Sequence, residues 1–105
     1  MKNLYLDIWV WLADNIFMEI EIKLYGSSKM LSKNETLLID LPEKSNIGQL
    51  RDTLKKFIDK NYSKSNLGNL SNSAAFFSER NEIINDSYQL KNKELISIIP
   101  PIGGG

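Results

Sequence analysis

Apolar and charged residues alternate along residues 18–24, and this alternation predicts the first clear element of the chain. The even-numbered residues from Met18 to Leu24 are apolar, whereas residues 19, 21 and 23 are charged. A period of two places one kind of side chain on each face of a strand, so the segment predicts a half-buried β-strand. Residues 35–41 (ETLLIDL) form a second strand candidate, ended by Pro42. We expect the two strands to pair antiparallel, joined by residues 26–34.

The apolar spacing changes to three or four residues after Pro42, which predicts a helix from Ile47 to Asn61. Asn46 and Gln49 form an approximate capping box at its start. Lysines gather toward its C-terminal end, where the helix dipole favours positive charge. The predicted core side carries Ile47, Leu50, Leu54, Phe57 and Ile58, and the predicted solvent side carries Arg51, Asp52, Lys55, Lys56 and Lys60.

The second half of the chain is divided into short segments that end in one more strand. Residues 94–99 (ELISII) offer apolar side chains to both faces, so we expect this last strand to pair centrally. The order strand, strand, helix and short strands indicates an α+β fold, a mixed sheet with one main helix on one face. The intervening segments are a loop (62–73), a short buried strand (74–77), a turn (78–81), a short strand or irregular stretch (82–85) and a polar connection (86–93).

Residues 1–17 (MKNLYLDIWVWLADNIF) are the most apolar part of the chain, and their pattern fits two kinds of element. A helix aligns Leu4, Ile8, Trp11 and Leu12, whereas a strand aligns Leu6, Ile8, Val10 and Leu12. The stretch is shorter than the roughly 20 apolar residues that span a bilayer. It is an extra element on the core, an interface segment, or sequence upstream of a biological start at Met18. We expect no membrane association and a cytoplasmic location.

Composition limits the chemistry that this chain can perform by itself. With 105 residues it has room for one hydrophobic core, and 13 basic residues balance 13 acidic ones. A neutral balance argues against a nucleic-acid partner. The chain has no Cys and no His, so it has no thiol nucleophile, imidazole base or Cys/His zinc site, and we expect no metal site. Glu79, Arg80 and Glu82, which lie near a predicted turn, are expected to be solvated surface charges.

The C-terminal sequence Pro100-Pro101-Ile102-Gly103-Gly104-Gly105 directly follows the last predicted strand. A frayed terminus is the ordinary interpretation of a glycine-rich end. Two prolines, however, remove two N–H donors and prevent the strand from continuing, so the tail should project away from the sheet. Glycines without Cβ atoms can thread a narrow channel. The α-carboxylate of Gly105 is a poor electrophile that adenylation by ATP would activate toward a sulfur nucleophile.

An ending of the form Pro-Pro-x-x-Gly-Gly after a hydrophobic strand resembles the MoaD family, the small sulfur-carrier subunits of molybdopterin synthase. Pro100 and Pro101 match the proline pair, and Gly104 and Gly105 match the terminal glycine pair. The resemblance covers residues 18–105, and the tail is its specific part. The remaining matches are patterns: an opening strand (18–26), a helix (47–61), a small-apolar strand (74–77) and the last strand (90–101).

This resemblance implies a β-grasp, ubiquitin-like fold and a carrier that is not an enzyme on its own. It implies that an E1-like enzyme of the MoeB type adenylates Gly105, and that a sulfur donor protein then supplies a thiocarboxylate. The large synthase subunit, of the MoaE type, would use that sulfur to build the dithiolene of the molybdenum cofactor. The chain would bind no cofactor itself, because ATP is used by the activating partner. The residues that would thread into partner active sites are Pro100, Pro101, Ile102, Gly103 and Gly104.

The resulting organisation has three parts: an apolar extension (1–17), a β-grasp domain (18–99) and a flexible tail (100–105). Of Phe76 and Phe77, one is expected in the core, and the other is expected to join Ile102 and residues of the last strand in an apolar patch facing a partner. The alternatives are a ThiS-like sulfur carrier for thiamine, a ubiquitin-like modifier that attaches Gly105 to lysines, and a non-enzymatic β-grasp binding module with an inert tail.

Overall fold

The computed structural model describes residues 17–65 and 67–101, and it begins with the two paired strands that the alternation predicts. β1 (Phe17–Leu24) and β2 (Thr36–Pro42) are antiparallel, with Ile20 opposite Ile39 in the register. The even-numbered residues of β1 are buried, and the charged residues between them lie on the other face. Both strands are therefore where the sequence places them, to within one residue at each boundary.

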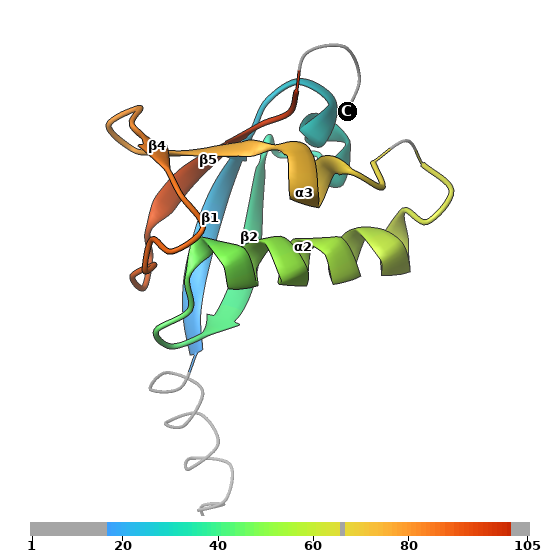
Figure 1. Cartoon of the computed structure of the whole chain (residues 1–105). Helices are drawn as coiled ribbons and strands as arrows, with labels where there is room; N and C mark the ends of the chain where they lie inside the picture. Colours follow the sequence, from blue (N-terminus) through green and yellow to red (C-terminus); the bar gives the residue numbers. More distant parts are fainter. Residues whose placement is uncertain (1–16, 66, 102–105) are drawn as a thin grey trace, which may run out of the picture.

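β5 (Leu95–Ile99) occupies the centre of a five-stranded mixed sheet in the order β2-β1-β5-β3-β4 (Figure 1). It runs parallel to β1 and antiparallel to β3 (Ala75–Ser78), and β3 pairs with the short edge strand β4 (Ile83–Ile84). The predicted central position of the last strand is confirmed. Ile96 and Ile98 are fully buried on the helix face of β5, and the strands on both sides pair with its backbone groups.

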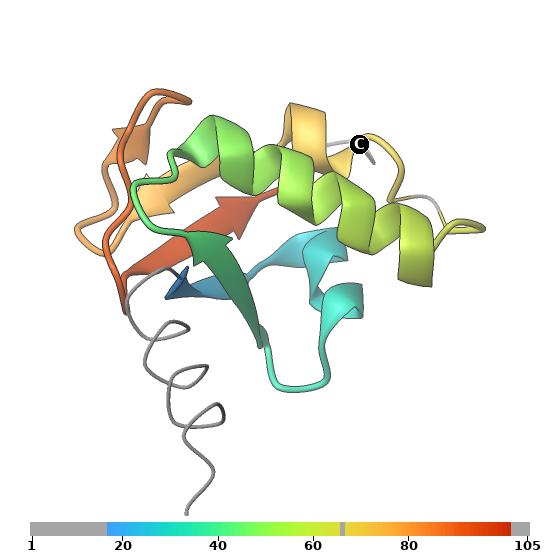
Figure 2. The same cartoon turned by 90° about the horizontal axis from the view of Figure 1, so that it is seen from below.

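Helix α2 (Ile47–Asn61) lies across one face of this sheet, as Figure 2 shows. Its start has the predicted capping box: the Gln49 amide donates to Asn46 Oδ1 (2.9 Å), and the Asn46 amide donates to Gln49 Oε1 (2.8 Å). The next two amides, of Ile47 and Gly48, donate to the carbonyls of Tyr88 and Asp86. The polar connection after β4 therefore completes the helix N-terminus, and this contact joins residues that are far apart in the sequence.

The hydrophobic core lies between α2 and the sheet, and the opposite sheet face is left uncovered by any described helix. We call this second face the open face. Because successive side chains of a strand point to opposite faces, the open face carries every second residue of each strand, between the buried ones. The open face consists of Phe17, Glu19, Glu21, Lys23, Thr36, Leu38, Asp40, Pro42, Ala75, Phe77, Ile83, Leu95, Ser97 and Ile99.

Two predicted loops contain short helices that the sequence pattern does not reveal. The 3₁₀ helix η1 (Gly26–Leu31) lies in the β1–β2 connection, and α3 (Leu70–Ser73) lies in the segment predicted as loop 62–73. Leu31, Leu67 and Leu70 are buried within these polar segments. These segments hold too few apolar residues to define a helical period, so only burial in the assembled core marks the turns around them.

The prediction that Arg51 lies on the solvent side of α2 is wrong. Its side chain is only 17% exposed; Nη1 donates to the carbonyls of Ser71 (3.0 Å) and Ala74 (2.7 Å), and Nε donates to Asp86 Oδ1 (2.8 Å). The guanidinium also lies 4.8 Å from the centre of the Phe76 ring. Arg51 thus ties α2 to α3, β3 and the segment after β4, because a planar five-donor group can serve several acceptors at once.

The predictions for the apolar N-terminal stretch fall on residues 1–16, which lie outside the described residues. Phe17, the last residue of that stretch, is the first residue of β1 and is half exposed. No helix among the described residues is both long enough and apolar enough to cross a bilayer.

Candidate functional site

The candidate site begins where β5 ends and the chain leaves the sheet. Ile99 is the last residue of β5, and Pro100 and Pro101 follow it as partly exposed residues outside any strand. Neither proline has an N–H to continue the ladder, which explains the end of the strand. The predictions for Ile102, Gly103, Gly104 and Gly105 fall outside the described residues. What the structure defines is the base from which that tail departs.

Gly26 supports this base from the turn after β1. Its φ of +57° lies in the left-handed region, and a Cβ built on it would lie 3.6 Å from Pro100 Cγ and 3.7 Å from Pro100 Cδ. The Pro100 ring therefore packs on the backbone of the β1–η1 turn. This contact joins the end of β5 to the end of the parallel strand beside it.

Tyr25, at the same turn, is held by hydrogen bonds from a buried serine. The Ser28 hydroxyl accepts from the Tyr25 amide (2.9 Å) and donates to the Tyr25 carbonyl (2.6 Å). On the open face, Lys23 Nζ lies 5.5 Å from the centre of the Tyr25 ring, within the range of a cation–π contact. The backbone of Tyr25 is thus held by Ser28, and its ring has a cationic neighbour in Lys23.

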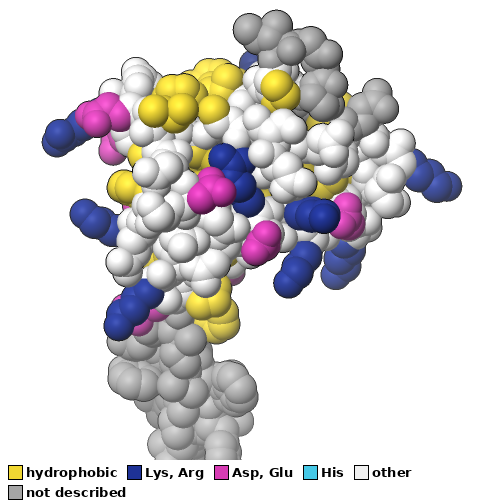
Figure 3. Space-filling view, viewed as in Figure 1, with side chains coloured by type: hydrophobic (Ala, Val, Ile, Leu, Met, Phe, Trp, Pro, Cys, Tyr) yellow, Lys and Arg dark blue, Asp and Glu magenta, His cyan; other side chains and the backbone are white. Residues whose placement is uncertain are grey.

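A hollow lies on the open face directly beside the tail base, and we call it the tail-side hollow. It has a volume of about 240 Å³ and is lined by Tyr25, Phe77, Asn81, Ser97 and Ile99. The register explains its position, since Ser97 sits between Lys23 on β1 and Phe77 on β3. A small side chain in the middle of this row leaves a depression among larger ones. Figure 3 shows the opposite, α2 side of the molecule, where hydrophobic side chains gather mainly along the upper edge.

The structure separates the two adjacent phenylalanines that the sequence places together. Phe76 is fully buried beneath α2, which confirms the expectation that one of the pair lies in the core and leaves Phe77 as the candidate for the partner-facing patch. Phe77 lies on the open face and lines the tail-side hollow with Ile99. Adjacent strand residues point to opposite faces, which is the physical reason for the separation.

Sequence reasoning missed Tyr25, Ser97 and Asn81 as members of this site. They come from three separate segments, and only the parallel pairing of β1 with β5 and the β3–β4 turn bring them together. No spacing along the chain signals that arrangement. The alternation within β1 and β5 does, however, place Tyr25 and Ser97 on the face opposite the core once the sheet order is known.

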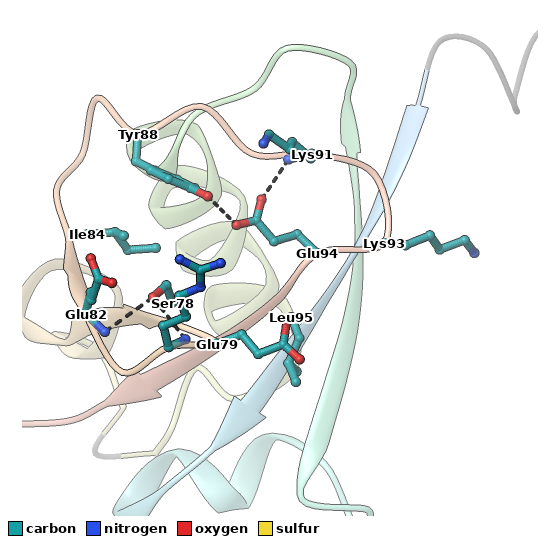
Figure 4. Close-up of a pocket in the computed structure, with 10 residues that line it drawn as sticks. Ser78, Glu79, Glu82, Ile84, Tyr88, Lys91, Lys93, Glu94 and Leu95 are labelled. Atoms are coloured by element: carbon teal, nitrogen blue, oxygen red, sulfur yellow. Dashed lines mark hydrogen bonds between the residues drawn. The ribbon is translucent and has the colours of Figure 1, made fainter.

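A second hollow, at the opposite end of β5, is lined by charged residues of both signs (Figure 4). The Tyr88 hydroxyl donates to Glu94 Oε2 (2.5 Å), and the Lys91 amide donates to Glu94 Oε1 (2.9 Å), so both carboxylate oxygens are occupied. The hydrogen bond to Glu94 raises the pKa of Tyr88, and burial and the negative charge of Glu94 act in the same direction. These contacts fix the loop before β5. The full lining is Ser78, Glu79, Arg80, Glu82, Ile84, Tyr88, Lys91, Lys93, Glu94 and Leu95.

Five of the six charged residues that line this charged hollow are exposed. Glu79, Arg80 and Glu82 are exposed, as predicted. Both acidic and basic groups line it, and the raised pKa of Tyr88 favours the neutral form of its hydroxyl. Among residues 17–65 and 67–101, no three His, Cys, Asp or Glu side chains gather in a way that would hold a metal ion.

Comparison with known proteins supports the fold through structure and not through sequence. Searches of protein-family profiles and of curated protein sequences find no match to this chain. A candidate molybdopterin converting factor, subunit 1, from Pyrococcus furiosus superposes with a TM-score of 0.61 and 15% identity, over 81% of this chain and 99% of that one. Small archaeal modifier protein 1 from Haloferax volcanii gives 0.60 and 16%, over 81% and 99%. At these identities the likeness establishes the fold, and the expected β-grasp, ubiquitin-like architecture is confirmed.

Proposed function

We propose that this β-grasp protein is a sulfur carrier that acts through the carboxyl group of Gly105, as the small subunit of a molybdopterin synthase. The observation that supports this most directly is the tail base: two prolines end the central strand beside the tail-side hollow, and the sequence continues with Ile102 and three glycines. The structural neighbours include a candidate molybdopterin converting factor subunit, which agrees with that role. The chain is not an enzyme by itself in this proposal, and we expect it to work in the cytoplasm.

The proposed chemistry is confined to one acyl group. An E1-like partner of the MoeB type transfers AMP from ATP to the Gly105 carboxylate and releases pyrophosphate. Sulfide supplied by a sulfur donor protein then attacks the acyl carbon, the C–O bond to AMP breaks, and the product is a thiocarboxylate. In the large synthase subunit, of the MoaE type, the sulfur passes to a pterin precursor and water restores the carboxylate. None of these steps requires a catalytic side chain from the carrier, in agreement with its lack of Cys and His.

The carrier's own residues have two tasks in this scheme. Pro100, Pro101, Ile102, Gly103 and Gly104 form a slender arm that enters a partner's active site. The tail-side hollow, with Phe77 and Ile99 on its wall, receives an apolar side chain of the partner and fixes where the arm starts. Because Ile99 belongs to both the hollow and the tail base, docking there positions the arm directly.

The decisive experiment is intact-mass measurement after incubation with ATP, an activating enzyme of the MoeB type and a sulfur source. Exchange of the terminal oxygen for sulfur adds about 16 Da, and the product must react as a thiol does. Deletion of Gly104 and Gly105, or extension of the chain beyond Gly105, should abolish the mass gain and leave the fold intact, because these residues follow the described core. A matched control substitutes Gly68, which has no atom within 4 Å of a built Cβ, and should react normally.

A ubiquitin-like modifier is the second candidate, and the likeness to small archaeal modifier protein 1 favours it. In that case activated Gly105 forms an amide with a lysine of another protein. Digestion of host proteins captured with a tagged chain would then release peptides with a Gly-Gly remnant on lysine. A sulfur carrier for thiamine instead predicts thiocarboxylate without such peptides and sulfur transfer to a thiazole precursor. A simple binding module predicts full function without Gly104 and Gly105.

A further inference from the structure

The outer edge of β2 has unpaired backbone groups whose direction the hydrogen-bond pattern fixes. The Leu24 amide donates to the Glu35 carbonyl (2.8 Å), and the Glu21 amide donates toward β5, to Glu94 (3.0 Å). Even-numbered residues of β1 therefore bond β2, and their partners on β2 are the odd-numbered residues 37, 39 and 41. It follows that the amides and carbonyls of Thr36, Leu38 and Asp40 point away from the sheet.

No described strand pairs with this edge, because β2 is the first strand in the sheet order. Figure 2 shows β2 along one border of the sheet, away from β3 and β4. Leu38, the middle residue of the three, is 58% exposed and lies between Thr36 and Asp40 on the open face. An open edge with an apolar centre is a template for strand addition.

We propose that β2 pairs antiparallel with β2 of a second copy of this chain, about a two-fold axis through Leu38. This register places Leu38 opposite its equivalent and Thr36 opposite Asp40 of the other copy. This two-fold register satisfies every outward amide and carbonyl of these three residues. Moving the axis to Leu37 or Ile39 would leave one of the three without a partner among them. Pro42, which has no N–H, limits the paired edge at its end.

Side chains on both faces of the sheet suit this pairing. On the open face the two Leu38 side chains contact each other, and the Thr36 hydroxyl meets the Asp40 carboxylate of the other copy. On the helix face, Leu37 lies opposite Ile39 of the other copy, and Leu37 is partly exposed in the single chain. The pairing therefore buries apolar surface on both sides of the sheet and leaves no charge opposite a like charge.

Charges one strand further in are also complementary across the axis. Within one copy, Lys23 lies beside Thr36 and Glu19 lies beside Asp40. After pairing, Lys23 and Thr36 of one copy lie in line, across the strands, with Asp40 and Glu19 of the other copy. The tail-side hollow and Pro100 lie beyond β1 and β5 and stay free, so the inference does not depend on the proposed function.

Disulfide trapping tests this register directly, because the chain has no cysteine of its own. In a hydrogen-bonded antiparallel pair the Cα atoms are about 5.5 Å apart, within the range that a disulfide bridges. Leu38→Cys should therefore form covalent dimers at least about tenfold faster than Ile83→Cys, a more exposed position on the opposite edge, because association raises the local thiol concentration.

Thr36→Cys is the register control. Its two copies would lie four positions apart along the strands, roughly 13 Å, and should not crosslink, whereas a mixture of Thr36→Cys and Asp40→Cys chains should. Sedimentation of the unmodified chain should show reversible self-association that Leu38→Glu abolishes. Equal crosslinking at positions 38 and 83, preferential crosslinking of Thr36→Cys alone, or a chain that stays monomeric while its β2 edge binds a peptide of another protein would each overturn the proposal.

Discussion

Gly26 and Pro100 lie against each other at the point where the chain leaves the sheet, with a built Cβ of Gly26 only 3.6 Å from Pro100 Cγ. Gly26 is the first residue of η1, just after β1, and Pro100 directly follows the end of β5. Since β1 and β5 are parallel neighbours, this contact couples the β1–η1 turn to the origin of the tail. Pro100, from which the tail departs, therefore packs against a glycine 74 positions earlier in the chain.

Gly26→Ala should lower the free energy of unfolding by about 1–2 kcal/mol, because an L-residue is strained at a φ of +57°. The added methyl group is in ordinary contact distance of Pro100, so strain and not collision is the expected cause. Urea denaturation measures the change. Gly68→Ala, in open space, is the control and should change stability by less than about 0.5 kcal/mol. Equal stability of the two variants would show that the turn is not constrained.

Ser97→Leu should fill the tail-side hollow and weaken binding of the activating enzyme or the large synthase subunit. We expect about a tenfold rise in Kd, which corresponds to about 1.4 kcal/mol, with little change in stability because residue 97 lies on the open face. Titration calorimetry with either partner provides the measurement. Ser73→Leu, the same change on an exposed residue of α3, should bind normally. Undiminished binding of the Ser97 variant would rule out the hollow as a docking point.

Arg51→Met should destabilise the fold by about 2 kcal/mol, because it leaves the carbonyls of Ser71 and Ala74 without their donor. Asp86→Asn should cost less than about 1 kcal/mol, since the Asp86 side chain is 64% exposed and its ion pair is screened by solvent. Denaturant unfolding of the two variants and of Arg80→Met, an exposed control, gives the comparison. A larger loss at Asp86 than at Arg51 would contradict this assignment.

Tyr88→Phe should destabilise the chain by about 1 kcal/mol at neutral pH, through loss of the hydrogen bond to Glu94. The pKa of Tyr88 is raised in the folded chain, so its contribution is complete below the unfolded value of about 10 and is lost as the pH rises through the folded pKa. The stability difference between the parent and the variant should therefore shrink in alkaline solution. Unfolding at neutral and alkaline pH measures it, with Tyr25→Phe as the control. A difference that is independent of pH would contradict the role of Glu94.

Local rules predicted the regular elements of this protein well. The alternation in β1, the capping box of α2 and the apolar run of β5 depend on neighbours within four residues, and all three are present in the structure. The same rules failed for η1, α3 and Arg51. In each case the outcome depends on a partner far along the chain: buried leucines that touch the core, and carbonyls of Ser71 and Ala74 that receive the Arg51 guanidinium.

The amino-acid sequence alone determined the strand and helix periods, the lack of thiol and imidazole chemistry, and the proline pair that ends β5 before a glycine-rich tail. Only the tertiary structure decided which side chains surround the base of that tail. The parallel pairing of β1 with β5 brings Tyr25 and Ser97 together, and the pleat of β3 sends Phe76 to the core and Phe77 to the open face. Strand partners are chosen by the burial of the whole apolar face at once, which no short stretch of sequence encodes.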